Sequence, residues 1–555
     1  MVSARQPAVR LLAVLALVSI ASAGVWIKLG TPRTGIDDAN IFFVYADSIS
    51  AGNGFAFNAG GERVEGFTSL LWVVICAAVL GVTPAPERLL LLLNVALLSA
   101  TVALSLRTCA VASASQRRQP SPGWGAALVV CLLADPAFVT WHTVALMETA
   151  LWGTLLTAAA LLVVQEDAGR TPVLLALVVA LLVLTRPEAL AWSPIFIVLF
   201  YVTRAHRGHG MAFRAAAPAL VSFLVTAGAL TLFRVSYFGY ALPNTFYAKV
   251  SPSVSYTVQE GAKYLVSYLG SGALPFASAV AAALSIVHIV LTRFSDVRTL
   301  AVAPLAAAAL AMPVLTGGDH FDGFRFYQAV YPILVLTLLH CARFVVPHYL
   351  PVRLLNHRSF HLVAASLGAG ALVTVQSVQW MSATRSSLLG VEFEFAESGR
   401  ELGGRGNMLF SGLAPRPSIA TITVGGLGYV YDGVVVDLMG LNDTRMAHNG
   451  GDRLGLRSHA AFERRTFDDL RPDVVIPLVQ FSGSIQAVRR RSLFVDAALK
   501  GLLDDPDFRR TYSLAEVSRT DATGVVRLPG WYRRDFLGQL AASKDLRIAA
   551  LPEPD

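Results

Sequence analysis

The feature that most constrains this chain is a series of apolar runs, many of them about twenty residues long, that alternate with short charged segments up to about Trp380. A helix of that length and composition can cross the hydrocarbon core of a bilayer. Hydrophobic residues make up 54% of the chain and charged residues only 15%, whereas soluble domains carry roughly 25% charge. A soluble fold could not bury so much apolar surface. The sequence therefore predicts a polytopic α-helical membrane protein.

We expect about eleven transmembrane helices. The predicted spans are Leu11–Lys28, Leu89–Leu106, Trp124–Ala134, Glu148–Val164, Val173–Thr185, Ala189–Val202, Ala216–Phe233, Leu274–Leu291, Leu300–Thr316, Ala329–Val346 and Leu362–Trp380. A further apolar stretch, Leu70–Val82, is too short to cross unless tilted and predicts an interfacial or re-entrant helix. The first span contains Ala21–Ala23, which resembles a signal-peptidase site. Because the apolar run continues through Ile27, we expect the first span to be retained.

Arginine residues between the spans predict the orientation, because cytoplasmic loops are enriched in Lys and Arg. If Leu70–Val82 lies at the interface, most of these arginines fall on one side, whereas the loop with Arg170, Glu166 and Asp167 is only weakly biased. The predicted inner arginines are Arg107, Arg117, Arg118, Arg204, Arg207, Arg214, Arg293, Arg298, Arg343, Arg353 and Arg358. We therefore expect a multi-pass membrane protein with a cytoplasmic N-terminus. The predicted outer segments are 29–88, 135–148, 186–188, 234–273 and 317–328, together with the C-terminal domain.

The long apolar runs end near residues 380–390, which predicts a transmembrane domain over 1–384 and a soluble domain on the outer face over 385–555. In this tail, IATITVG, GVVVDLMG and DVVIPLV are typical of short strands, and SLFVDAALKGLL is typical of a helix. A small α/β domain is expected, with acceptor binding or a lid as its possible roles. Gly425, Gly426 and Gly428 follow the first strand, but we expect another strand after Tyr429 instead of a helix, which disfavours a dinucleotide-binding loop.

Charge and cysteine content exclude other classes of protein. The net charge of +8 comes largely from arginines between spans, so it indicates topology and not nucleic-acid binding. The four cysteines lie in or beside apolar runs, where they cannot form a CxxC-type metal cluster or link the soluble domain. No cofactor is required by the sequence, although a divalent cation remains open.

The first outer segment, 29–88, carries an adjacent carboxylate pair, Asp37 and Asp38, followed by an aromatic and Gly-rich stretch and then by Arg63 and Glu65. Neighbouring side chains point in different directions. One carboxylate can therefore act as a general base while the other caps a helix or binds a cation. We favour Asp38 slightly as the base, because Asp37 lies nearer the first span and is well placed to cap the following turn. The structural alternative is a solvated loop with an N-cap.

Three further motifs place polar side chains on the predicted outer face: TRPE, LPNTFYAKV and TGGDHFDGFRFYQAVYP. Their candidate residues are Arg186, Glu188, Asn244, Tyr247, Lys249, Asp319, His320, Asp322 and Arg325. The alternatives are a helix hairpin at Pro187 and an interfacial anchor at Lys249. One Asp and one His do not make a zinc site. Cations at headgroup level and a carboxylate base are what a reaction on a lipid-linked anionic substrate requires.

These motifs, together with GIDDANIFFVYADSISAGNGFAFN and ERVEGFTSLLW, resemble in this order the GT-C membrane glycosyltransferases, in particular the mycobacterial terminal β-1,2-arabinofuranosyltransferases and their bacterial relatives. GGLGYVYDGVVVDLMGLND and RPDVVI resemble the periplasmic domain of that family. The resemblance implies a polyprenyl-phosphate sugar donor, arabinofuranose among the sugars, and a glycan, lipid or protein acceptor. It also implies a bacterial inner-membrane protein that transfers the sugar on the periplasmic face, where its C-terminal domain would lie. It implies Asp37 or Asp38 as the base. Arg186, Lys249 or Arg325 would lie beside the donor phosphate, and the other candidates, Arg63, Glu65, Glu188, Asn244, Tyr247, Asp319 and His320, would contact substrate.

Two other classes of function stay open. A transporter or flippase of lipid-linked sugars would place ionisable residues or Gly/Pro breaks near the middle of paired spans, and these spans have few. A non-catalytic assembly protein of the envelope or flagellum would tolerate loss of both Asp37 and Asp38. Some relatives bear names tied to flagellar function, so the resemblance fixes neither donor nor acceptor.

Overall fold

A computed structural model describes residues 5–114, 122–165, 169–208, 210–350, 377–451, 453–479, 493–521 and 524–552, with Gly370 and Thr374. The chain divides into two compact units. The helical unit comprises Met1–Thr31, Arg88–Leu230 and Ser255–Leu389, and the sheet unit comprises Pro32–Glu87, Thr231–Val254 and Gly390–Asp555. The predicted boundary near residue 385 lies beside the last of these divisions. The sheet unit also contains most of the first outer segment, 29–88, and Thr231–Val254, which the predicted division placed in the transmembrane domain.

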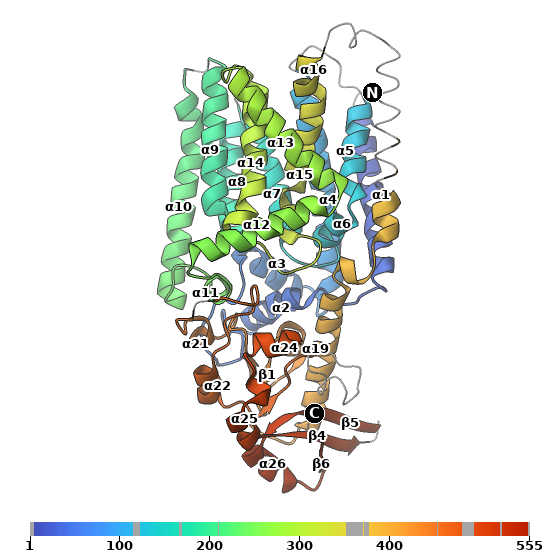
Figure 1. The fold of residues 1–555 in the computed structure, drawn as a ribbon, viewed down its shortest axis with the longest axis vertical. Helices are drawn as coiled ribbons and strands as arrows, with labels where there is room; N and C mark the ends of the chain where they lie inside the picture. The colour runs from blue at the N-terminus through green and yellow to red at the C-terminus, as the bar shows by residue number, and fades with distance from the viewer. Residues whose placement is uncertain are drawn as a thin grey trace. The chain divides into compact units, whose positions relative to one another are not determined.

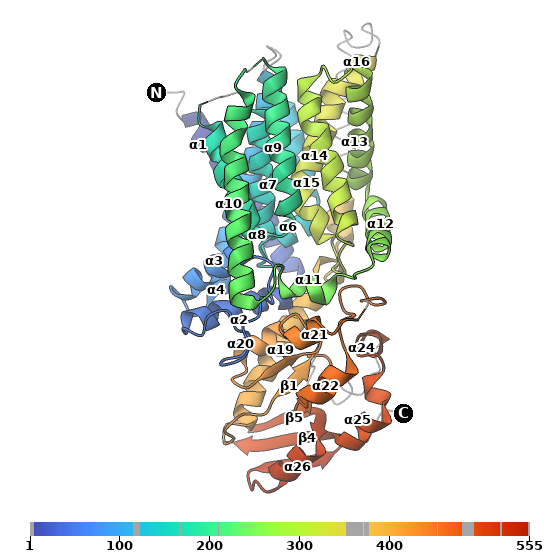
Figure 2. The ribbon, with the colours of Figure 1, turned by 90° about the vertical axis from the view of Figure 1, so that its left-hand side faces the viewer.

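Long helices build the helical unit, and Figures 1 and 2 both show α7, α9, α14 and α15 side by side in it. The helices that lie wholly or mostly in this unit are α1 (Arg5–Lys28), α4 (Pro86–Ala114), α5 (Pro122–Ala134), α6 (Pro136–His142), α7 (Thr149–Val164), α8 (Thr171–Thr185), α9 (Ala189–His206), α10 (Ala212–Phe238), α12 (Val254–Gly270), α13 (Ala273–Leu291), α14 (Val297–Leu315), α15 (Arg325–His340) and α16 (Val346–Tyr349). A π-helical turn, Cys341–Val345, joins α15 to α16.

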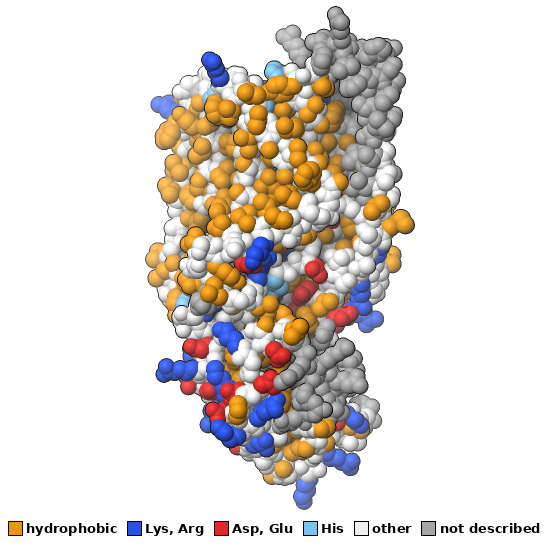
Figure 3. Space-filling model, viewed as in Figure 1, with side chains coloured by type: hydrophobic (Ala, Val, Ile, Leu, Met, Phe, Trp, Pro, Cys, Tyr) orange, Lys and Arg blue, Asp and Glu red, His pale blue; other side chains and the backbone are white. Residues whose placement is uncertain are grey.

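Among the residues described, seven helices are long and apolar enough to cross a membrane. Helices α5 and α6 together make an eighth candidate, bent by 76°, because Asp135 accepts a hydrogen bond from the N–H of Ala137 (2.8 Å) and Pro136 cannot continue the helix. Helices α7 and α8 are shorter apolar helices, as is α3 (Leu70–Leu80). Hydrophobic side chains form a broad band over the helical unit (Figure 3). The chain is therefore a polytopic helical membrane protein, and the predicted span Leu362–Trp380 lies largely outside the described residues.

The orientation of these spans can be tested with reporter fusions. We expect alkaline phosphatase fused to the C-terminus to be active and the same enzyme fused after Arg118 to be inactive, because the inner loops carry the arginines. The inner residues Arg117, Arg118, Arg353 and Arg358, and the pair Glu166 and Asp167, lie outside the described residues. An inactive C-terminal fusion or an active fusion after Arg118 would contradict the predicted topology.

The sheet unit contains a six-stranded sheet in the order β2-β1-β3-β5-β4-β6. The strands are β1 (Ile419–Thr421), β2 (Val435–Asp437), β3 (Val474–Val475), β4 (Tyr512–Asp521), β5 (Gly524–Arg533) and β6 (Leu546–Ala550). Strand β1 pairs in parallel with β2 and β3, whereas β5 is antiparallel to β3 and β4, and β6 is antiparallel to β4. The three predicted strands are β1, β2 and β3. The predicted α/β domain is therefore confirmed.

The sheet unit also contains helices, and two of them, α2 (Asp37–Ser50) and α3, come from the first outer segment. The others are α11 (Asn244–Lys249), α19 (Gly390–Leu409), α20 (Gly425–Val430), α21 (Thr444–Ala447), α22 (Arg464–Leu470), α24 (Leu493–Ala498), α25 (Pro506–Thr511) and α26 (Arg534–Ala541). Phe467, Phe508, Tyr512 and Trp531 belong to a buried cluster, in which the rings of Phe508 and Tyr512 stack 4.7 Å apart. Helix α20 packs against both α19 and α2, so the segment around Asp37 is held by the tail.

Candidate functional site

Asp37 and Asp38 are the first two residues of α2. Carboxylates are favourable at this position because they face the positive end of the helix dipole. The chain here is helical, so the two side chains diverge by about 100° around the helix axis. Asp37 is 5% exposed, whereas the side chain of Asp38 is 22% exposed. This divergence explains why the side chain of Asp38 is more exposed than that of Asp37, as expected if only one of the two carboxylates is accessible to substrate.

The carboxylate of Asp37 binds the N-terminus of α20. Its Oδ2 accepts a hydrogen bond from the N–H of Gly425 (3.0 Å), and its Oδ1 accepts one from the N–H of Gly426 (2.8 Å). A Cβ on Gly425 would lie 1.9 Å from the backbone oxygen of Asp37, so only glycine fits. The prediction that no helix opens at these glycines was wrong, because α20 begins at Gly425. A carboxylate of the chain itself pairs with the first N–H groups of this helix.

Burial raises the pKa of Asp37 to about 6, although the N–H groups of Gly426 and Gly425 oppose the rise. In an unfolded chain the pKa of Asp is about 4. Between about pH 4 and 6 the folded protein therefore keeps a proton that the unfolded chain releases, so stability should fall as pH rises through this window. We expect Asp37→Asn to flatten that fall by about 2 to 3 kcal/mol. Thermal unfolding from pH 4 to 7 measures it, and parallel wild-type and variant curves would contradict it.

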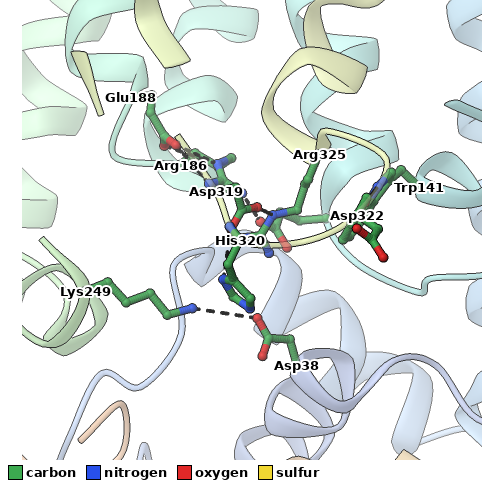
Figure 4. Close-up of polar contacts among 10 residues, drawn as sticks. Asp38, Trp141, Arg186, Glu188, Lys249, Asp319, His320, Asp322 and Arg325 are labelled. Carbon is green, nitrogen blue, oxygen red and sulfur yellow. Dashed lines mark hydrogen bonds and ion pairs between the residues drawn. The ribbon is translucent and has the colours of Figure 1, made fainter. Parts of the chain in front are cut away.

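Asp38 lies beside Lys249, the last residue of α11. The Lys249 ammonium is 3.8 Å from Asp38 Oδ2, and both side chains are about one fifth exposed. Figure 4 shows the lysine directed at the carboxylate. Two sequence candidates, a carboxylate and a cation about 210 residues apart along the chain, are thus brought together in the sheet unit. At this distance the ion pair is loose, so both groups can reorganise around a ligand.

The other candidates in the LPNTFYAKV motif support α11. The Asn244 side chain donates hydrogen bonds to the carbonyls of Gly440 (2.8 Å) and Leu441 (3.0 Å), and its N–H donates to the Glu65 carbonyl (3.0 Å). The Tyr247 ring lies 4.2 Å from the His448 ring. These contacts hold the helix that carries Lys249, and they give Asn244 a structural role in the described chain.

Glu65 forms a buried ion pair with Arg234, a residue that sequence reasoning missed because it follows directly on a predicted span. Arg234 donates from Nε and Nη2 to the Glu65 carboxylate at 2.8 to 3.1 Å, and both side chains are at most 6% exposed. Burial raises the pKa of Glu65, and Arg234 opposes the rise. Arg63 is exposed, with its guanidinium 4.7 Å from the centre of the Tyr237 ring.

In the helical unit, Arg186 lies between α8 and α9 and binds two carboxylates. It donates to Glu188 (2.8 Å) and to Glu148, which is fully buried. Burial opposes the charge on Arg186, but Glu188 and Glu148 outweigh it and raise the pKa of the guanidinium. Sequence reasoning treated Glu148 only as the start of a span. Its partner could not be identified from spacing alone.

Arg325 begins α15 and binds Asp319 from the preceding loop. Arg325 Nε donates to Asp319 Oδ2 (2.6 Å), and the N–H of His320 donates to Asp319 Oδ1 (2.9 Å). The His320 ring packs against Phe321, 4.0 Å away, and the Asp322 carbonyl accepts a hydrogen bond from Trp141. Figure 4 shows this loop. No group of three or more His, Cys, Asp or Glu side chains that could hold a metal ion occurs among the described residues.

A pocket of about 430 Å³, which we call the Arg325 pocket, lies between α7, α9, α14 and α15 in the helical unit. Its walls include Trp152, Trp192 and Phe326, and its charged groups are Arg186, Glu188 and Arg325. Thr149 also lines it, and the buried Thr149 hydroxyl has no hydrogen-bond partner within the described part of the chain. An apolar pocket with guanidinium groups at one end suits a lipid with an anionic headgroup.

The fold can be compared with known proteins. No family model and no curated protein sequence matches the chain. Among solved structures, it is similar to the archaeal oligosaccharyltransferase AglB from Archaeoglobus fulgidus, solved in complex with an inhibitory peptide and a dolichol-phosphate. The two are 13% identical, with a TM-score of 0.52 over 97% of this chain and 75% of AglB.

A second solved structure is ArnT from Cupriavidus metallidurans bound to undecaprenyl phosphate, at 14% identity and a TM-score of 0.49 over 79% of this chain and 88% of ArnT. The similarity to AglB extends over both the membrane helices and the C-terminal α/β domain, and at this level of identity it concerns the arrangement of the chain. The protein therefore shares its overall fold with the archaeal oligosaccharyltransferase AglB.

Proposed function

We propose that this protein is a glycosyltransferase that moves a sugar from a polyprenyl-phosphate donor to an acceptor hydroxyl. The observation that carries the proposal is the partly exposed pair of Asp38 and Lys249, 3.8 Å apart. The reaction needs a carboxylate base and a cation, and the pair supplies both. AglB, which shares the fold, was solved with a dolichol-phosphate, a lipid of the same chemical class.

In the proposed reaction, the acceptor oxygen attacks the anomeric carbon of the sugar. The bond from that carbon to the phosphate oxygen breaks, and polyprenyl phosphate leaves with the electron pair. Asp38 takes the proton of the acceptor hydroxyl. Lys249 stabilises the negative charge that grows on the phosphate.

Asp38 is the better base of the two candidates. Both carboxylate oxygens of Asp37 accept hydrogen bonds from α20, and its side chain is buried. Taking a proton there would break contacts that hold α2 to α20. Asp38 is open to solvent on one side, so an acceptor hydroxyl can approach it.

In the helical unit, we assign the Arg325 pocket to the donor lipid, with isoprene units against its aromatic walls. Arg186 and Arg325 are accompanied by Glu148, Glu188 and Asp319, so the guanidinium charges are already matched by carboxylates. A phosphate therefore gains less here than beside an unbalanced cation. The carboxylates and the Thr149 hydroxyl are suited to sugar hydroxyls. The resemblance favours arabinofuranose as the sugar, an envelope glycan, lipid or protein as the acceptor, and transfer on the periplasmic face.

Lys249→Ala should weaken donor binding about tenfold or more, because a charge-assisted contact contributes roughly 1.5 to 3 kcal/mol. Arg325→Gln should weaken donor binding less, because Asp319 already matches the charge of Arg325. Donor affinity of the purified variants measures this. The matched control is Lys263→Ala, since Lys263 is an exposed lysine paired with Glu260 in α12. Because Arg325 also binds Asp319, thermal stability is measured alongside. Wild-type donor affinity in both folded variants would place the phosphate elsewhere.

The function itself is tested by reconstituting the protein in vesicles with a polyprenyl-phosphate pentose and an envelope extract as acceptor. We expect release of polyprenyl phosphate and a labelled acceptor. Movement of the donor across the bilayer without its consumption would identify a flippase and overturn the proposal. Mass analysis of envelope glycans from a deletion strain then identifies the sugar and its acceptor.

A further inference from the structure

A second pocket, which we call the Arg343 pocket, lies in the helical unit at the other end of α15 from Arg325. The space between its walls, which is partly open to solvent, measures about 400 Å³. The walls come from the end of α4, the start of α5, the end of α7, the start of α14 and the last turns of α15. Trp124, Val302, Leu336 and Leu339 make these walls apolar. The proposed transfer reaction does not use this pocket.

His340 lines the Arg343 pocket and is 6% exposed. Its Nε2 lies 2.9 Å from the Thr299 hydroxyl, which itself donates to Asp296 Oδ2 (2.6 Å). A hydroxyl has one proton, so Nε2 must donate to Thr299. The other ring nitrogen, Nδ1, is buried and has no hydrogen-bond partner among the residues that the structure describes. Leaving such a group unpaired costs free energy, so it points to a ligand.

Arg343 is the charged residue of the same wall, three residues after His340 and therefore on the same side of the helix. It lies in the π-helical turn Cys341–Val345, a feature often found at functional sites. Its guanidinium lies 5.8 Å from the centre of the Trp124 ring and 5.2 Å from that of Phe344. The aromatic faces hold the cation at the pocket.

Arginines are frequent at this end of the helical unit. Arg204 lies in the last turn of α9, Arg207 follows that helix, and Arg298 lies in the first turn of α14. Figure 3 shows Lys and Arg side chains at the upper rim of the apolar band. The carboxylate of Asp296 is already bound by Thr299 and lies 3.2 Å from His288. The local field therefore favours an anion at headgroup depth.

From these observations we infer that the Arg343 pocket binds the phosphate headgroup of a membrane lipid. The guanidinium of Arg343 pairs with two phosphate oxygens, and a hydroxyl of the headgroup donates to Nδ1 of His340. One hydrocarbon chain lies against Leu336, Leu339 and Val302. A phospholipid and a polyprenyl phosphate carry the same group. On the predicted topology this is the cytoplasmic face, opposite the Arg325 pocket.

The test is a lipid titration of delipidated full-length protein, followed by native mass spectrometry. The probes are phosphatidylglycerol, undecaprenyl phosphate and diacylglycerol, which lacks the phosphate. We expect Arg343→Ala to lower the affinity for at least one phosphate lipid about tenfold or more. Leu336→Trp, which fills the pocket without changing charge, should do the same. Arg293→Ala, an exposed arginine at the same end of the unit, is the matched control and should bind like wild type.

Each outcome decides the proposal. A loss confined to phosphatidylglycerol identifies a phospholipid as the ligand. Loss of one of two bound undecaprenyl phosphates identifies a second carrier-lipid site, because the Arg325 pocket would keep the other. Binding curves that coincide with wild type in both folded variants would overturn the proposal. Equal binding of diacylglycerol and phosphatidylglycerol would also overturn it, since the phosphate would then contribute nothing.

Discussion

Asp38→Asn should reduce turnover by about 10² to 10⁴ while leaving the protein folded, because the amide keeps the shape of the side chain but cannot accept the acceptor proton. Loss of a general base acts on the chemical step, so donor affinity should change far less than turnover. The stability effect should be small, since the pair with Lys249 is partly exposed and 3.8 Å long. The assay measures transfer from a polyprenyl-phosphate pentose by purified protein, with thermal unfolding recorded in parallel.

Asp47→Asn is the matched control, because Asp47 is an exposed carboxylate on the same helix, α2. It should keep wild-type turnover. Asp37→Asn provides the contrast: its defect should be in stability and its pH dependence, since Asp37 holds α20. If the folded Asp38→Asn variant turns over near the wild-type rate with a confirmed donor, the base is another carboxylate, and Glu188 and Asp319 become the candidates.

Glu65→Ala should destabilise the sheet unit by about 3 to 5 kcal/mol, the cost of leaving a buried Arg234 without its carboxylate. For a unit of this size the melting temperature should fall by roughly 10 °C. Differential scanning fluorimetry and limited proteolysis of the full chain measure the change. The sequence offered Glu65 as a substrate-binding residue, so this variant separates a structural role from a functional one.

Glu62→Ala serves as the control, because Glu62 is an exposed glutamate three residues earlier that accepts a hydrogen bond from the N–H of Thr444 (2.8 Å). Its effect should be within about 1 kcal/mol. Replacing both Glu65 and Arg234 by leucine should recover much of the loss, since no charge is then buried alone. A stable Glu65→Ala variant with impaired transfer would instead assign Glu65 to substrate.

The longest strands of the tail show one limit of sequence reasoning. Strands β4 and β5 were not predicted, although each is ten residues long. Charged and polar residues such as Glu516, Arg519 and Arg527 interrupt their apolar pattern. They pair with each other in a long antiparallel register, from Tyr512 opposite Arg533 to Asp521 opposite Gly524. Backbone pairing of this kind stabilises strands whose side-chain pattern is weak.

The membrane class, the short apolar helix at Leu70 and the early strands of the tail were determined by the sequence itself. The transfer free energy of an apolar run is a sum over neighbouring residues, so it can be read locally. The choice between Asp37 and Asp38 could not be made from neighbouring residues, because it depends on Gly425 and Gly426, nearly four hundred positions away.

The ion-pair partners of charged side chains could not be predicted from neighbouring residues either. Sequence motifs identified Glu65, Arg186 and Lys249, but their partners Arg234, Glu148 and Asp38 lie 169, 38 and about 210 positions away. Burial and pairing decide whether a charged side chain is a structural tie or an open group, and both depend on contacts between distant segments. The sequence by itself thus determined which residues carry charge at the ends of the spans. Only the tertiary structure decided that Glu65 and Asp37 are buried in contacts of the sheet unit and that Asp38 and Lys249 face one another.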